Sequence, residues 1–128
     1  MKLIAIDTSI AIEILNNQKA AINKISNYDV VCLPIIVCGE LLFGAKNSSR
    51  KIVNEKKFND FIQSCVILNS NSLVAEEYAQ IRKELKEKGK PIPENDIWIA
   101  AICKVNEIPL ATRDKHFKNI TNLKMVKI

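Results

Sequence analysis

The chain has 128 residues, of which 48% are hydrophobic and 26% are charged. This length and composition are typical of one globular domain with a proper core, and they exclude a disordered chain. No apolar run approaches the roughly 20 residues needed to span a bilayer, and the segment after Lys2 lacks the hydrophobic region of a signal peptide. We therefore expect one domain over residues 1–128, located in the cytoplasm and without a membrane partner.

The formal net charge is +5, which weakly favours a polyanionic partner. The four cysteines are scattered through apolar segments and form no C-x-x-C pair. They therefore read as small buried hydrophobic residues in a reducing compartment rather than as disulfides or metal ligands.

Short apolar runs alternate with segments of helical periodicity along the whole chain. The apolar runs predict strands at residues 3–6, 30–33, 65–68, 108–112 and 124–128. The periodic segments predict helices at about 8–15, 19–26, 34–47, 48–64, 73–88 and 94–105. This alternation indicates an α/β fold: a doubly wound, mostly parallel central sheet flanked by helices.

Three of these helices carry features that ask for an explanation. Gly39 lies inside an apolar helix, which suggests a close backbone approach at that point. The helix at 48–64 is basic and amphipathic, with an apolar side that includes Ile52 and Val53; that side either joins the core or offers a groove to a partner helix. Helix 94–105 is apolar almost all round, so we expect it to be packed on two sides, with Trp98 in the core.

Four acidic residues stand against apolar segments. Asp7 and Asp114 each follow a short apolar strand, Asp96 lies in the first turn of an apolar helix, and Glu40 interrupts another. The carboxyl ends of parallel strands and the N-termini of the helices that follow share one edge of the sheet, where such folds bind their ligands. We expect Asp7, Asp96 and Asp114 to meet there. Glu40 lies within its helix, so its position in the sequence does not by itself bring it to that edge.

Grouping carboxylates is electrostatically unfavourable. At about 4 Å, each pair of like charges repels by roughly 1 kcal/mol in water and about 4 kcal/mol at an effective dielectric of 20. Such a cluster either holds protons or recruits a cation. Oxygen ligands select Mg²⁺, with Mn²⁺ possible, and His116 is the only histidine, which excludes a zinc site built from histidines. A divalent ion beside a basic surface suits hydrolysis of a phosphodiester.

Each acid also has a structural explanation. Asp7 could cap a helix, Glu40 could be solvated, Asp96 could complement a helix dipole and Asp114 could belong to a turn. Two other classes of protein also remain open. One is an aspartyl-phosphate enzyme or receiver domain, although it would need a second acid beside the first and a positioned lysine. The other is a non-catalytic RNA-binding or assembly module that keeps the same fold.

Four motifs, in order, resemble the PIN-domain ribonucleases and, more narrowly, the VapC-type toxins of toxin–antitoxin modules. They are Ile6-Asp7-Thr8-Ser9, Gly39-Glu40-Leu41, Pro93-x-x-Asp96-x-x-Ile-Ala-Ala and Ala111-Thr112-Arg113-Asp114-x-x-Phe117. The resemblance covers essentially the whole chain.

This resemblance implies Mg²⁺-dependent endonucleolytic cleavage of RNA, neutralisation by a cognate antitoxin, and a homodimer. It also implies roles for the catalytic acids: Asp7, Asp96 and Asp114 would hold the metal, and Glu40 would ligate directly or through water. The hydroxyl of Thr112, and that of Thr8 or Ser9, match positions that support the acids or contact phosphate. Candidate RNA contacts, chosen because they adjoin Asp114 in sequence, are Arg113, Lys115 and His116.

Overall fold

The computed structural model describes all 128 residues. Its strands are β1 (Leu3–Ile6), β2 (Val30–Pro34), β3 (Val66–Leu68), β4 (Leu110–Ala111) and β5 (Met125–Val126). Its helices are α1 (Thr8–Leu15), α2 (Lys19–Ile25), α3 (Ile35–Lys46), α4 (Lys51–Gln63), α5 (Ser72–Lys88), α6 (Glu94–Asn106) and the short 3₁₀ helix η1 (Lys115–Asn119).

The strands form one five-stranded sheet in the order β3-β2-β1-β4-β5, and every neighbouring pair is parallel. The chain first builds outwards from β1 to β3 and then returns to the other side of β1. The predicted doubly wound, parallel α/β fold is therefore confirmed. The point where the order reverses lies between β1 and β4, and open α/β sheets place their sites at such a point.

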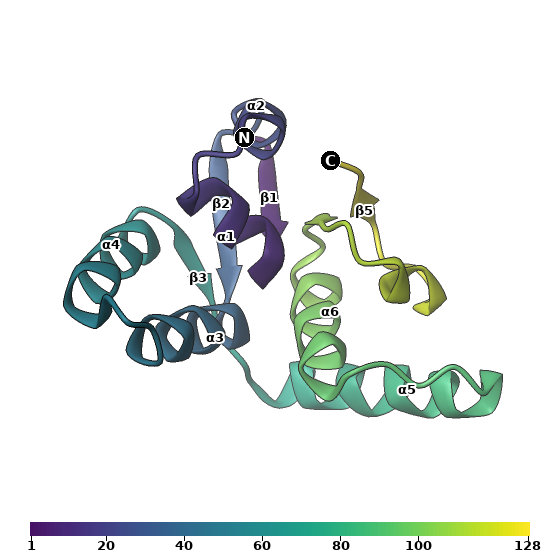
Figure 1. Ribbon diagram of the computed structural model, residues 1–128. Helices are drawn as coiled ribbons and strands as arrows, with labels where there is room; N and C mark the ends of the chain where they lie inside the picture. Colours follow the sequence, from purple (N-terminus) through teal and green to yellow (C-terminus); the bar gives the residue numbers. More distant parts are fainter.

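Strand β1 lies at the centre of the hydrophobic core. Ile4, Ala5 and Ile6 are fully buried and belong to one cluster of 29 buried residues that draws on nearly every helix and strand. Because β1 is covered on both faces, neither face is exposed to solvent, and its sequence therefore contains no alternating polar residues. Figure 1 shows the arrowheads of β1 and β2 pointing towards the end of the molecule where α3 and α6 lie.

Helix α6 is packed on two sides, as its sequence predicts. Ile97 and all residues from Ile99 to Cys103 are buried. Trp98, at the margin of the core, stacks on Tyr78 of α5, with ring centroids 3.9 Å apart and planes 12° from parallel. In Figure 1, α5 and α6 meet in a corner, and α6 rises from it beside the η1–β5 segment. This packing fixes the first turn of α6 relative to the sheet.

Several predictions of detail are wrong. Strands β4 and β5 have two residues each, because only Leu110, Ala111, Met125 and Val126 pair in the sheet. Gly39 makes no close approach, since a Cβ there would meet no atom within 4 Å. Cys65 is only partly buried, unlike the other three cysteines.

The fourth helix also differs from its prediction. It begins at Lys51 rather than at residue 48, and its only buried residue is Ile62. Ile52 and Val53 are 85% and 54% exposed, so the apolar side does not join the core at that end of the helix. No helix in the protein combines the length and apolarity needed to cross a membrane.

Candidate metal centre

Asp7 is buried at the carboxyl end of β1 and is held by two hydrogen bonds. It is 5% exposed, and Thr112 is the only other buried polar residue. The Ile10 amide donates to Oδ1 of Asp7 at 2.9 Å, so Asp7 is the N-cap of α1. The Thr112 hydroxyl donates to Oδ2. Helix capping and a role in the site are thus compatible, because each carboxylate oxygen retains a lone pair.

Thr112 connects two of the acids. Its hydroxyl donates to Asp7 and accepts the backbone N–H of Asp114 at 2.9 Å. The two strands that carry these residues are neighbours: Ile6 pairs with Ala111. The pairing of β1 with β4 therefore brings Asp7 and Asp114 to the same edge of the sheet, although Thr112 and Asp7 are 105 positions apart.

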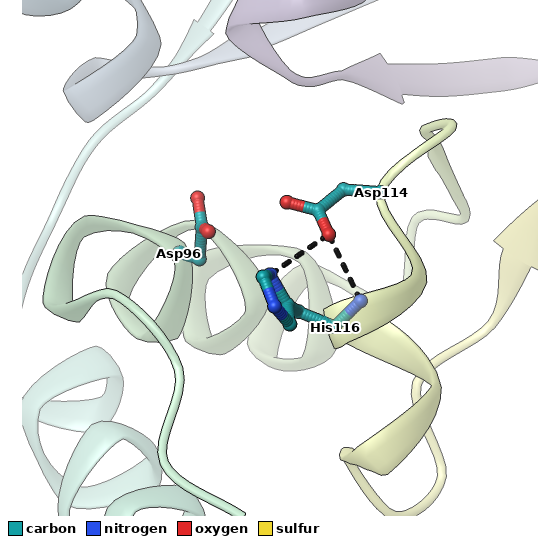
Figure 2. A group of neighbouring side chains, drawn as sticks. All are labelled: Asp96, Asp114 and His116. Carbon is teal, nitrogen blue, oxygen red and sulfur yellow. Dashed lines mark hydrogen bonds and ion pairs between the residues drawn. The ribbon is translucent and has the colours of Figure 1, made fainter.

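Asp96 lies in the first turn of α6 and faces Asp114. Figure 2 shows Asp96 extending from the helix while Asp114 and His116 approach from the segment after β4. Burial, followed by the charges of Asp114, Glu40 and Asp7, raises the pKa of Asp96 from 3.8 to about 6. Burial also raises the pKa of Asp7, with smaller contributions from Asp114 and Glu13. Asp96 is thus within electrostatic reach of the other three acids.

Glu40 is held at the margin of this cluster. The Thr8 hydroxyl donates to its Oε1 at 2.6 Å, and the Asn95 side-chain amide donates to Oε2 at 3.4 Å. Helix α3 thereby contributes a carboxylate fixed by one residue from α1 and one from α6. Asn95 belongs to no predicted site motif, and its only signal in the sequence is its position beside Asp96.

The acids and histidine that lie closest to one another are Asp96, Asp114 and His116. One ligand atom from each lies within 4.8 Å of the other two. His116 was predicted only as an RNA contact, but its Nδ1 lies 3.0 Å from Oδ1 of Asp114, and its backbone N–H donates to the same oxygen at 2.9 Å. Asp7 is not part of this tight group. One histidine with two carboxylates remains a suitable donor set for a divalent cation.

Such a cation fits the physical state of the cluster. Burial and three neighbouring carboxylates disfavour the charged form of Asp96, and a divalent ion bound there would offset that charge. The hydrogen bonds on Asp7 resemble the outer interactions that orient metal-binding carboxylates.

The remaining predicted residues divide into two groups. Arg113 forms a two-pronged ion pair with Glu13 of α1, at 2.8 Å from Nε to Oε2 and 3.0 Å from Nη2 to Oε1. Its guanidinium is therefore already paired with a carboxylate of the protein. Ser9 and Lys115 are exposed and form no hydrogen bond through their side chains, so they are available to a ligand.

Comparison with known proteins defines the class. The PIN domain family model matches residues 4–123, so the chain belongs to the PIN domain family. The resemblance to VapC-type ribonucleases is also confirmed. Ribonuclease VapC2 of Rickettsia felis is 28% identical over 123 residues, covering 92% of both chains.

Two further matches agree with this one. The tRNA(fMet)-specific endonuclease VapC of Shigella flexneri is 25% identical over 122 residues, covering 93% of this chain and 92% of its own length. The crystal structure of VapBC2 from Rickettsia felis, bound to a DNA fragment from its promoter, contains a chain that superimposes with a TM-score of 0.91. That chain is 26% identical, and the match covers 98% of each chain.

Proposed function

We propose that this protein is a metal-dependent endoribonuclease, acting as the toxin of a toxin–antitoxin pair, with residues 1–128 forming one nuclease domain in the cytoplasm. The observation that carries the proposal is the convergence of Asp7, Glu40, Asp96 and Asp114 at one edge of the sheet. The negative charges of the other three acids help to raise the pKa of Asp96 there. Membership of the PIN family and the relatives named as ribonucleases support it.

The acids have distinct parts in this proposal. Asp96 and Asp114, with His116 and the oriented Asp7, would hold Mg²⁺ or Mn²⁺. When bound, such an ion neutralises a phosphate oxygen and lowers the pKa of a water molecule. Glu40 retains lone pairs beyond its hydrogen bonds to Thr8 and Asn95, so it is suited to orient a water molecule near the phosphate.

Cleavage of RNA by point variants tests this assignment. Purified protein with Mg²⁺ or Mn²⁺ should cut a mixed RNA pool internally, and EDTA should stop the reaction. Asp7→Asn and Asp96→Asn should lower the rate at least about 100-fold. Asp60→Asn is the matched control, because Asp60 is exposed and its only side-chain hydrogen bond and ion pair is with Lys56.

Two results would contradict the proposal. Cleavage at the normal rate by Asp7→Asn and Asp96→Asn would show that these acids do not act in it. Binding of RNA by the unmodified protein with no cleavage in either metal would favour the non-catalytic module instead.

An antitoxin partner is the second part of the proposal, supported by the toxin–antitoxin complex of a structural relative. Large apolar side chains are exposed on the contacting helices α1, α3 and α4: Ile12, Phe43, Ile52 and Val53. Such a surface suits an apolar segment of a second protein. Ile52→Asp should weaken capture of the antitoxin in co-expression and leave RNA cleavage unchanged; an unchanged complex would place the contact elsewhere.

A homodimer is the third part. Val66, Ile67 and Leu73 are exposed along the β3 edge and the start of α5, and they offer a separate apolar surface for a second copy. Light scattering of the isolated protein should give twice the monomer mass, and a monomer at micromolar concentration would contradict this.

A further inference from the structure

A pocket of about 310 Å³ lies beside the acidic cluster, between the segment that follows β4 and the chain around β5. Thr112 and Asp114 belong to both the pocket and the cluster. A group bound in the pocket is therefore next to the proposed site of cleavage without occupying it.

Cations dominate the polar lining of this pocket. Arg113 is committed to Glu13 and also donates to the backbone oxygen of Ile128 at 3.5 Å. The other three cations are lysines that form no salt bridge and no hydrogen bond within the protein: Lys115, Lys118 and Lys127. Asp114 is the only acid in the lining. Because three lysines have no protein partner, the pocket attracts an anion.

The apolar residues that line the pocket indicate which kind of anion it binds. Met125, Val126 and Ile128 are partly buried and form one side of the pocket. A free phosphate would need only the lysines. A phosphate joined to a ribose and a base would also cover the apolar wall, and lysine contacts with the phosphodiester backbone are the main source of affinity for RNA. None of the large exposed apolar residues of the protein lies here, which disfavours a protein helix as the occupant.

We propose that this pocket binds one nucleotide of the RNA strand, adjacent to the phosphodiester held at the acidic cluster. Lys118 and Lys127 contact its phosphate, and the side chains of Met125, Val126 and Ile128 contact its ribose and base. This inference rests on the proposed function, because it takes RNA as the substrate of the neighbouring acids.

The two methionines of the chain give a direct test. Met125 lines the pocket, and Met1, which is 96% exposed, is an internal control. In Asp96→Asn protein with ¹³C-labelled methionine methyl groups, a mixed-sequence single-stranded RNA decamer should shift the Met125 signal much more than the Met1 signal. Inorganic phosphate at the same phosphate concentration should leave Met125 unmoved.

Two outcomes of this titration overturn the proposal. One is a Met125 signal that stays in place when fluorescence anisotropy shows the RNA to be bound. The other is an equal shift with a glutamate decamer, which would identify an acidic peptide as the occupant.

Substitutions of the lysines provide an independent test. Lys118→Ala with Lys127→Ala should raise KM for RNA cleavage about tenfold. The pair should also reduce the slope of log affinity against log salt by about 0.7, the value for one neutralised phosphate in a single strand. Lys57→Ala with Lys83→Ala is the control pair, since both lysines are exposed and unpaired on α4 and α5.

The two proposals fail in different ways. If the unmodified protein cuts RNA and both double variants keep its KM and its salt slope, the pocket proposal is wrong and the proposed function stands. If the unmodified protein cuts no RNA in Mg²⁺ or Mn²⁺, the proposed function is wrong, while the Met125 titration still tests the pocket.

Discussion

Replacement of Asp96 by asparagine should stabilise the metal-free protein while it abolishes cleavage. Burial and the carboxylates of Asp114, Glu40 and Asp7 raise the pKa of Asp96 from 3.8 to about 6. At neutral pH the folded protein therefore carries an unfavourable charge at this position. Asparagine has nearly the same shape and no charge, so it relieves that repulsion.

The size and sign of the effect follow from linkage. A carboxyl whose pKa is higher in the folded state binds its proton more tightly there, so its contribution to stability is present below pH 3.8 and is lost as the pH rises through 6. At about 1.36 kcal/mol for each pKa unit, the full difference is about 3 kcal/mol. Because Asp96 is partly exposed, solvent screening reduces this to about 1–2 kcal/mol.

Thermal and urea denaturation in EDTA would measure this difference. At pH 7.5 the Asp96→Asn protein should melt roughly 3–8 °C above the unmodified protein, and the gap should close near pH 4. Addition of Mg²⁺ should stabilise the unmodified protein more than the variant. Asp60→Asn is again the control. If Asp96→Asn were less stable at pH 7.5, or if the gap did not change with pH, the cluster would not hold Asp96 under electrostatic repulsion.

Two further substitutions separate structure from chemistry at the same site. Thr112→Val should lower the free energy of unfolding, measured by urea denaturation, by about 1–3 kcal/mol, because it leaves the buried Asp7 carboxylate and the Asp114 N–H without their shared partner. Thr112→Ser keeps the hydroxyl and should restore most of this stability. Equal stability of the Val and Ser variants would refute this. Glu40→Gln keeps an oxygen that can accept from Thr8, so we expect at least about 100-fold slower RNA cleavage with an unchanged melting temperature; normal cleavage would exclude Glu40 from the reaction.

The fold was predictable because its elements have strong, separate sequence patterns. Leu3–Ile6 reads as a buried strand from its unbroken apolar run, and Gly89 ends α5 in the left-handed conformation that favours glycine. The edge elements were less predictable. Strands β4 and β5 have two residues each, so their limits depend on partners rather than on local pattern.

The convergence of the acids was predictable from topology, but their individual contacts were not. The parallel sheet places Asp7 and Asp114 at one edge, as expected. His116 turns back towards Asp114, whereas Arg113 turns away to Glu13. These directions depend on the conformation of the loop and its side chains, which the spacing of residues in the sequence does not predict. Asn95 was missed for the same reason: its partner Glu40 is 55 positions away.

The hydrogen bond from Thr112 to Asp7 joins the last quarter of the chain to its beginning, 105 positions earlier. A chain folded only as far as α6 would therefore hold Asp7 without Asp114, so the acidic cluster is complete only once β4 has paired with β1.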